Sequence, residues 1–402
     1  MPRGSAKRVN DKSIARAEHV ILCINRGSSS LKFSLYRLGA KEDLIASGEV
    51  DRIGMPGCSI RVKDGAGKLL REGPYDSSDN HEIFGAIFAG LREYGLPAPV
   101  AVGHRIVHGG PHHVAPERVT SKLVAALREI VPFAPLHLPS AIAAIEAIAA
   151  RFPGLPQVTC FDTAFHHTMP ETAARFPLAS DLWNEGVRRY GFHGLSYEYI
   201  VDALGKAARG RVIIAHLGNG ASLAAVRDGI GVDTTMGFTP TGGLMMGTRS
   251  GDLDPGLMLY LINEKHYDAA KLEDAVNHAA GLLGVSGLSS DMRTLEESRD
   301  PRAALAREMF CYILRKHIGA MAAALGGVDT LVFTGGIGEH DAAVRWNVCG
   351  ELKHLGIHLD RKRNLAHRDP ISSAKSRCSV RVIPTNEDLV IARHARAIIG
   401  DQ

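Results

Sequence analysis

Apolar residues follow two patterns along the chain, and together they predict an α/β protein whose opening is repeated in its second half. Val20–Asn25 is a continuous apolar run typical of a buried strand, and Leu31–Tyr36 alternates apolar and polar positions like the second strand of a hairpin. Arg211–His216 and Ala221–Arg227 repeat this order of strand, glycine turn and strand. The repeat predicts a duplicated domain.

Strands and helices alternate through the rest of both halves. The pattern predicts further strands at Leu44–Val50, Cys58–Val62, Val100–Val107, Gln157–Asp162, Thr330–Phe333 and Val380–Ile383. It predicts helices at His81–Tyr94, Ser140–Arg151 with Ser140 as the N-cap, Pro301–Leu325 and Thr385–Ile399. Because α/β proteins bind ligands at strand ends, we expect a site between two lobes.

Length and composition exclude several classes of protein. A chain of 402 residues is long enough for two domains, and 47 basic against 43 acidic residues is too slight an excess for a nucleic-acid surface. No apolar run reaches the ~18 residues of a membrane span, and Met1–Glu18 lacks the apolar core of a secretory signal. We expect a cytoplasmic protein that binds neither nucleic acid nor membrane, with residues 1–18 as a disordered basic extension.

The cysteines are spaced too widely to form a metal or redox motif, since no Cys-x-x-Cys pair occurs. Most stand among apolar neighbours, so we expect reduced and buried thiols. They are Cys23, Cys58, Cys160, Cys311, Cys349 and Cys378.

The stretch Met236–Pro255 is rich in glycine and predicts a loop whose backbone can approach a ligand closely. Arg249, between small residues, could place a planar fork of donors on an oxyanion such as a phosphoryl group. A mobile surface loop is the alternative. A nucleotide P-loop is rejected, because Thr248 stands where that motif requires lysine.

Glycine turns recur after the predicted strands, and a group of such turns suits a polyphosphate held by backbone amides and hydroxyls. The turns are Gly27–Ser30, Gly218–Gly220, Gly242–Gly247 and Gly335–Gly338.

An arginine and several histidines stand at the end of the predicted strand Val100–Val107. A metal site could be built from His104, His108, His112 and His113, but the set lacks carboxylates and has no HExxH spacing. Arg105 as a clamp for an anionic substrate is the better interpretation.

Three further residues are candidates for chemistry. Asp162 ends a strand, where it could equally cap a helix. His193 stands between two glycines, which is unusual for a core histidine and favours a role at a ligand. Glu387 follows Asn386 at a strand-to-helix junction, where a carboxylate can hold Mg²⁺ or merely serve as a first-turn acid.

The order of these motifs resembles the acetate kinases, the acetate and propionate kinase branch of the superfamily that includes sugar kinases and actin. The resemblance runs from about Val20 to the C-terminus. Its markers are Asn25–Phe33, His104–Gly110, Phe161–His166, Arg189–Gly194, His216–Gly220, Met236–Pro255, Phe333–Glu339 and Thr385–Glu387.

The resemblance implies an α/β, two-lobed and duplicated actin-like ATPase (ribonuclease H-like) fold with its active site in the cleft between the lobes. Residues 19–162 and 388–402 would form the N-terminal lobe, which holds the acyl substrate and the phosphate loop. Residues 163–387 would form the C-terminal lobe, which binds nucleotide and makes a homodimer. The reaction would convert ATP and acetate to ADP and acetyl phosphate, in either direction, with Mg²⁺ or alternatively Mn²⁺.

The resemblance also implies roles for individual residues. It places the metal on Asn25 and Glu387, the acyl carboxylate on Arg105, an essential acid at Asp162, and transition-state donors at His193 and Arg249. The acyl group would lie against Val107, Leu136, Phe192 and Pro240. Nucleotide would contact Lys32, His216, Leu217, Gly218, Asn219, Gly220, Asp291, Met292, Arg293, Gly335, Gly336, Ile337, Gly338 and Glu339.

The sequence departs from the family pattern at Arg26, Thr241–Gly242, Gly335 and His340. Three alternatives stay open. The first is a propionate or other short-chain acyl kinase, because one methylene separates substrates by only ~1–3 kcal/mol. The second is a nucleotide-dependent structural or chaperone-like protein, because fold does not settle function. The third is a metallohydrolase that uses the histidines.

Overall fold

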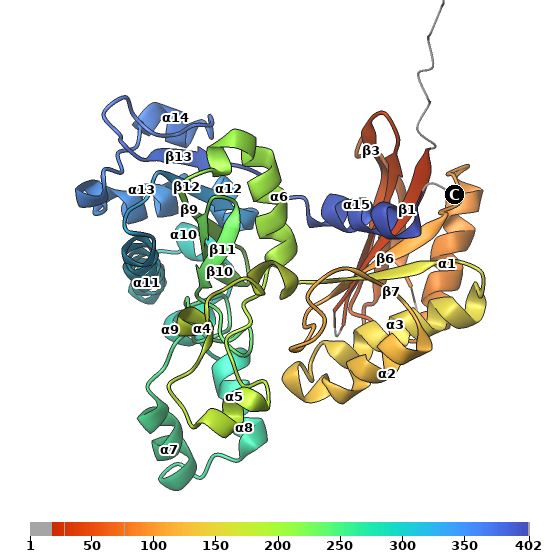
Figure 1. Cartoon of the computed structure of the whole chain (residues 1–402), viewed down its shortest axis with the longest axis horizontal. Helices are drawn as coiled ribbons and strands as arrows, with labels where there is room; N and C mark the ends of the chain where they lie inside the picture. The colour runs from red at the N-terminus through yellow and green to blue at the C-terminus, as the bar shows by residue number, and fades with distance from the viewer. Residues whose placement is uncertain (1–17, 28, 76, 401–402) are drawn as a thin grey trace, which may run out of the picture.

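The computed structural model describes residues 18–27, 29–75 and 77–400, so the predicted basic extension lies outside the described residues except for Glu18. The chain forms two lobes side by side, each built on one β-sheet (Figure 1). Lobe one contains the eight-stranded sheet and lobe two the five-stranded sheet. In the described part of the chain, no helix has both the length and the apolar character needed to span a membrane.

The sheet of lobe one has the strand order β5-β4-β3-β2-β1-β6-β8-β7. The neighbours β3, β2 and β1 are antiparallel, whereas β1, β6 and β8 run parallel. The strands are β1 His19–Arg26, β2 Leu31–Leu38, β3 Glu42–Asp51, β4 Ser59–Asp64, β5 Leu69–Pro74, β6 Ala101–Ile106, β7 Glu117–Arg118 and β8 Gln157–Phe161.

The sheet of lobe two has the order β11-β10-β9-β12-β13 and repeats the directions of β3-β2-β1-β6-β8. Its strands are β9 Arg211–Leu217, β10 Ala221–Arg227, β11 Ile230–Thr234, β12 Thr330–Thr334 and β13 Ser379–Val382. The predicted duplication and the α/β two-lobed fold class are therefore confirmed.

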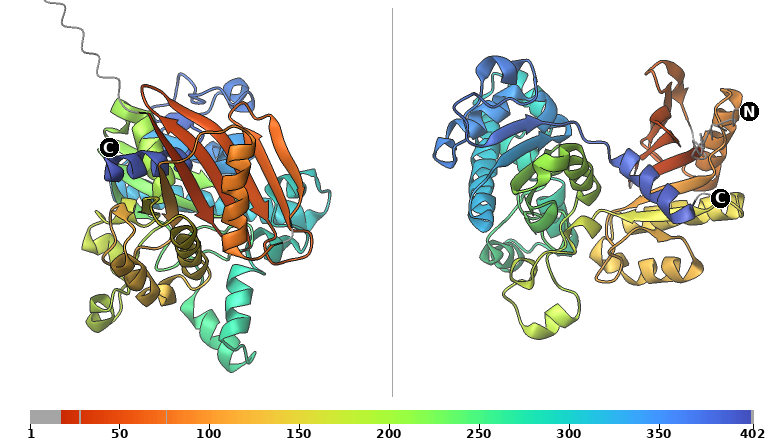
Figure 2. Two further views of the ribbon diagram at one scale, coloured as in Figure 1. Left: turned by 90° about the vertical axis from the view of Figure 1, so that its right-hand side faces the viewer. Right: turned by 45° about the horizontal axis from the view of Figure 1, so that its top comes forward.

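The helices cover both faces of each sheet, and the C-terminal helix α15 returns to lobe one to lie along β1 and β6 (Figures 1 and 2). They are α1 Asn80–Glu93, α2 Ser121–Glu129, α3 Leu138–Arg151, α4 Glu171–Ala174, α5 Ser180–Asn184, α6 Gly194–Leu204, α7 Pro255–Asn263, α8 Ala269–Asn277, α9 Gly281–Ser286, α10 Met292–Glu297, α11 Pro301–Leu325, α12 Gly335–His340, α13 Ala342–Gly350, α14 Arg361–Leu365 and α15 Glu387–Ile399.

The first strand of each sheet shows why these layers form. In β1, Leu22 and Ile24 pack with α1 and α3 on one face, while Ile21 and Cys23 pack with α15 on the other. In β9, alternate residues likewise pack on α11 or on α6. A strand buried on both faces needs a continuous apolar run, which is the pattern seen in the sequence. All six cysteines are buried and free, as expected.

Two local predictions are wrong. Ser140 does not cap its helix, because α3 begins at Leu138 after His137, and the Ser140 hydroxyl donates to the His137 carbonyl instead. Residues Gly335–His340 form the short helix α12 rather than a turn. Short glycine-rich helices have no apolar periodicity from which to predict them. The lobe boundaries at residues 162 and 388 stay a prediction, which the return of α15 to lobe one supports.

Candidate active site

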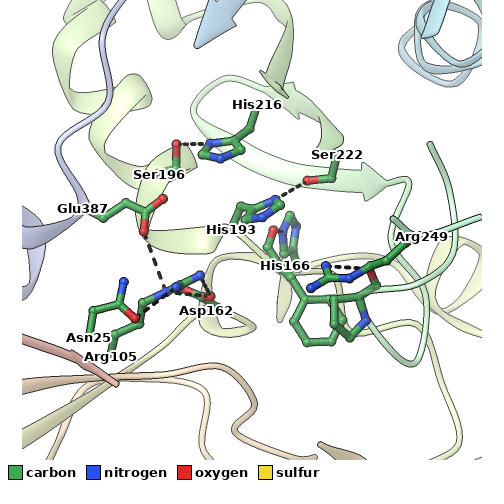
Figure 3. A network of polar contacts seen from close by, with 12 residues as sticks. Asn25, Arg105, Asp162, His166, His193, Ser196, His216, Ser222, Arg249 and Glu387 are labelled. Carbon is green, nitrogen blue, oxygen red and sulfur yellow. Dashed lines mark hydrogen bonds and ion pairs between the residues drawn. The ribbon is translucent and has the colours of Figure 1, made fainter. Parts of the chain in front are cut away.

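Three candidate side chains stand at the carboxyl ends of adjacent parallel strands. β6 lies between β1 and β8, so Asn25 near the end of β1, Arg105 near the end of β6 and Asp162 just after β8 come together. Glu387, the first residue of α15, faces the same point (Figure 3). The topology explains how residues so distant in sequence meet, because parallel strands place their carboxyl ends on one edge of a sheet.

Arg105 is held by a fixed set of partners. Its Nε donates to both carboxylate oxygens of Asp162 at 3.1 and 3.0 Å, and its Nη2 donates to Asp162 Oδ2 at 2.5 Å. Its Nη1 donates to Asn25 Oδ1 at 3.3 Å, and Glu387 Oε2 lies 3.7 Å from Nε. Three of the five N–H groups of a guanidinium are thus engaged, which leaves two for a ligand.

Burial acts on both members of the Arg105–Asp162 pair. Burial lowers the pKa of Arg105, but the carboxylates of Asp162 and Glu387 outweigh it, so the net shift is upward and Arg105 stays charged. Burial raises the pKa of Asp162, which is 1% exposed, and the guanidinium opposes this rise. Since the carboxylate is bonded to a permanently charged group, its main effect is to orient Arg105.

Two stacked histidines from lobe two face this cluster. His193 has left-handed backbone angles (φ 58°, ψ 25°) where the chain enters α6, and its Nδ1 is hydrogen-bonded to Ser222 Oγ at 2.8 Å. Its ring lies on that of His216, with centroids 4.2 Å apart. His216 Nδ1 is in turn bonded to Ser196 Oγ at 2.8 Å. These bonds leave Nε2 of each imidazole to face the site.

Both imidazoles are neutral at physiological pH. Burial lowers the pKa of His193 well below its ordinary value, and His216 and the nearby arginines lower it further. Burial, with Arg105 as a second cause, lowers the pKa of His216 to about 4. A neutral imidazole whose Nε2 carries the proton is a donor suited to charge that develops on an oxyanion.

Arg249 enters the site from the loop Met236–Pro255. Its Nη1 donates to the Pro240 carbonyl at 3.2 Å, and no carboxylate within the described ranges pairs with it. Burial, and then repulsion by Arg105, lowers its pKa. A Cβ added to Gly220 would lie 3.3 Å from His193 Nε2 and 3.5 Å from Arg249 Nη1. The two donors therefore border the same small space, which a side chain at position 220 would enter.

The loop that carries Arg249 is packed and hydrogen-bonded, so the alternative of a mobile surface loop does not hold. Met245 and Met246 are buried. Gly243 N donates to Asp252 Oδ1 at 2.7 Å, and Thr248 Oγ1 donates to the Asn277 carbonyl at 2.8 Å. No helix or strand interrupts it before α7 begins at Pro255. The prediction of an irregular glycine-rich segment is confirmed.

A cavity of about 540 Å³ lies next to this site in lobe two, a size that suits a nucleotide-scale ligand. Several residues expected to contact nucleotide line it, namely Gly218, Asn219, Asp291, Met292, Arg293, Gly336 and Ile337. Ser290, Glu296, His340 and Asp341 also line it and were not predicted.

Other residues assigned to nucleotide lie outside that lining. Lys32 is exposed and paired with Glu49 at 3.7 Å, and His216 belongs to the stacked pair. The Glu339 carboxylate accepts from Gly335 N at 2.8 Å and from Thr385 N at 3.3 Å, so it joins α12 to the segment before α15. Leu217 and Gly338 are buried in the core, and Gly220 borders His193 and Arg249. Their contact with nucleotide stays a prediction.

The four residues predicted to hold the acyl group differ in burial. Phe192 is 1% exposed and belongs to the main core cluster of lobe two, against which Val107 of lobe one packs. Leu136 is 41% exposed. Pro240 has a second role, because its carbonyl accepts a hydrogen bond from Arg249. Val107 and Phe192 could thus supply one apolar wall at the lobe interface.

The histidine metal site is not formed. His104 Nε2 donates to Gln157 Oε1 at 2.7 Å, and His113 Nδ1 pairs with Glu117 at 2.7 Å. The ring of His108 packs against Tyr190, 4.4 Å between centroids. Across residues 18–27, 29–75 and 77–400, no group of three or more histidines, cysteines or acids could hold a metal ion.

Several residues that no sequence pattern marks support the site. Ser222 holds His193 and is also bonded to the Tyr197 hydroxyl, and Ser196 holds His216. His137 has a pKa lowered to about 4 by burial and by the nearby guanidinium groups of Arg249 and Arg105. Ser196 lies in α6 and Ser222 in β10, each between apolar neighbours, so no local sequence pattern marks either serine as functional.

Comparison with known proteins gives consistent results over nearly the whole chain. The model of the "Acetokinase family" matches residues 20–393. The acetate kinase of Rhodopseudomonas palustris CGA009 is 48% identical over 388 residues, covering 93% of this chain and 97% of that protein.

Two solved structures are similar to this fold. The crystal structure of Porphyromonas gingivalis acetate kinase has a TM-score of 0.88 and 39% identity, and covers 95% of this chain and 100% of that one. A propionate kinase from Francisella tularensis also has a TM-score of 0.88, with 34% identity and coverage of 94% and 98%.

Proposed function

The chain belongs to the acetokinase family and has the activity of an acetate kinase, and on this premise we propose which of its residues move the phosphoryl group between ATP and acetate. The observation that carries the assignment is the meeting of Arg105 from lobe one with His193 and Arg249 from lobe two (Figure 3). Two cations and a neutral donor around one small space suit a phosphoryl group in transfer.

Arg105 holds the attacking carboxylate. A carboxylate is ionised at neutral pH, so it needs placement and charge neutralisation rather than a strong base. Asp162 and Asn25 fix the guanidinium through three of its N–H groups, and the two that remain can bind the acyl carboxylate. Asp162 therefore acts as a positioning residue, and its effect reaches the substrate through Arg105.

His193 and Arg249 stabilise the transferred group. Both donors border Gly220, and both are preorganised, His193 by Ser222 and Arg249 by the Pro240 carbonyl. Preorganised donors in a buried site act more strongly than donors in water, because they need no reorganisation as charge develops.

Asn25 and Glu387 fit a hard divalent cation, since both present oxygen ligands beside Arg105. Mg²⁺ is usually bound by one or two carboxylates together with water and substrate phosphates, so two protein ligands suffice. We propose that these residues hold Mg²⁺, which would neutralise phosphate charge when bound. The nucleotide would occupy the 540 Å³ cavity of lobe two.

We also propose that lobe two forms a homodimer through α7. No residue of α7 is buried, and Leu257, Leu259, Tyr260 and Ile262 are 40%, 61%, 47% and 44% exposed. Contiguous exposed apolar side chains are characteristic of interaction surfaces. A second copy of the chain is the occupant that family membership suggests.

Product trapping tests the function. With Mg²⁺-ATP and hydroxylamine, we expect acetate-dependent hydroxamate together with ADP. Propionate and butyrate assayed in parallel decide the acyl range, because the similarity to a propionate kinase favours propionate as the second candidate substrate. ATP turnover that is independent of any carboxylate, or no turnover, would contradict the assignment. A variant lacking Arg249 that hydrolyses ATP unchanged would favour a structural role for nucleotide.

A further inference from the structure

A second cavity, of about 170 Å³, lies beside the segments that carry Asp162 and His193, and two arginines are part of its lining. It is bordered by Arg188, Arg189, His166 and His167, and by the loop that follows β6. No carboxylate is part of this lining among the described residues. Since one water takes up about 30 Å³, the space exceeds that of a single water but is too small for a nucleotide.

The Arg188 side chain is unusual because it has no hydrogen-bond or ion-pair partner within the described ranges. Its guanidinium lies 5.0 Å from the ring of Trp183 and 5.9 Å from that of Tyr190, and its buried Nε has no acceptor. Aromatic faces hold a guanidinium in place but do not satisfy its N–H groups. An anion in the adjacent cavity would satisfy them.

His166 adds a requirement on the ligand. Its Nε2 donates to the Phe192 carbonyl at 3.1 Å, and burial lowers its pKa to about 4, so the ring is neutral. Nδ1 is then a bare acceptor. It is buried, like the whole side chain, which is 1% exposed, and no residue that the structure describes is hydrogen-bonded to it. Arg188 and His166 thus both line the cavity, and each has a buried nitrogen, a donor on Arg188 and an acceptor on His166, without a partner in the described part of the chain.

We propose that this cavity is a binding site for inorganic hydrogen phosphate. The phosphate oxygens accept from Arg188, and the remaining P–OH donates to His166 Nδ1. The cavity borders Thr163, which follows Asp162, and Tyr190, which precedes Phe192 and His193. A bound phosphate therefore joins the segment after β8 to the segment before α6, and stabilises the relative positions of the two catalytic groups.

Isothermal titration of phosphate and of sulfate tests the site in the full-length protein. A non-hydrolysable ATP analogue with Mg²⁺ and saturating acetate first fill both the nucleotide site and the acyl-carboxylate site at Arg105, so that phosphate cannot bind there. We expect phosphate to bind, and sulfate, which has no proton to donate at neutral pH, to bind at least about tenfold more weakly. Failure of the analogue to bind would count against the proposed function, whereas failure of phosphate to bind counts against this site alone.

Variants decide whether Arg188 is responsible. Arg188→Gln should abolish phosphate binding, and Arg175→Gln is the matched control, because Arg175 lies over the same Trp183 ring at 5.5 Å but pairs with Glu171 outside the cavity. If Arg188→Gln does not fold, Val114→Phe keeps the arginine and fills the cavity from its border. Unchanged phosphate binding in a folded Arg188→Gln or Val114→Phe variant, or equal binding of sulfate, overturns the proposal.

Discussion

Replacing Arg249 by alanine should separate catalysis from folding more cleanly than replacing Arg105. Among the described residues, the Arg249 guanidinium donates to the Pro240 carbonyl at 3.2 Å and more weakly to Met246 Sδ at 3.9 Å. Its removal should cost folding only about 1 kcal/mol. Loss of Arg105 would instead leave the buried Asp162 carboxylate unpaired, at a cost of about 3–5 kcal/mol.

The catalytic cost of Arg249→Ala should be large. Removing one preorganised donor typically lowers kcat by about 10²–10³, or roughly 2.7–4 kcal/mol. We therefore expect kcat for acetyl phosphate formation to fall by about that factor, with the melting temperature within a few degrees of the parent protein. Hydroxamate formation measures the rate, and thermal unfolding monitored by circular dichroism measures stability.

Arg249→Lys provides the control, because it keeps the charge and loses the planar fork. We expect its kcat to lie between those of the parent protein and the alanine variant. If a folded Arg249→Ala protein retains kcat within tenfold of the parent, Arg249 does not stabilise the transferred group, and the assignment of the loop Met236–Pro255 is wrong.

Three other outcomes are expected. Arg26 donates to the carbonyls of Gly27 and Ser30 at 2.6 and 3.0 Å, so Arg26→Ala should loosen this turn and raise KM for ATP several-fold while KM for acetate stays unchanged. Burial lowers the pKa of His104 to about 4, against about 6.5 when unfolded, so its contribution to the free energy of unfolding should be fully present above pH 6.5 and be lost as the pH falls towards 4. Urea denaturation at several pH values measures this slope, and His104→Gln should reduce it by the share of one histidine, because other buried histidines also contribute. Leu259→Glu should convert a dimer to a monomer in light scattering, and an unchanged mass would exclude α7 as the interface.

The strands and the position of the site could be predicted because both depend on local patterns. A β-strand buried on two faces requires a continuous apolar run, and Val20–Asn25 and Arg211–His216 are such runs. Arg105 lies near the end of β6 and Asp162 directly after β8, so their meeting follows from the parallel topology. The short helices between Glu171 and Asn184, and between Pro255 and Glu297, were not predicted, because they are too short to show periodicity.

The supporting shell of the site could not be predicted, because its contacts join residues that are neighbours only in the fold. Ser222 and Ser196 fix the two histidines from different elements. The histidines within and after β6 were ambiguous from the sequence for the same reason. Their spacing permits a metal site, but His104 and His113 each have a partner that sequence spacing does not reveal, Gln157 and Glu117.

The charges of the site explain why both lobes are needed. Arg105 comes from lobe one and Arg249 from lobe two, and in the free protein each guanidinium disfavours the other, which contributes to the lowered pKa of Arg249. An anion between them replaces this repulsion with two attractions. If the phosphoryl group binds there as we propose, the same interaction favours the approach of the lobes, and a substrate with less negative charge would gain less from it. An approach of the two lobes would also remove water from the space between them, and loss of water strengthens every electrostatic contact within the site.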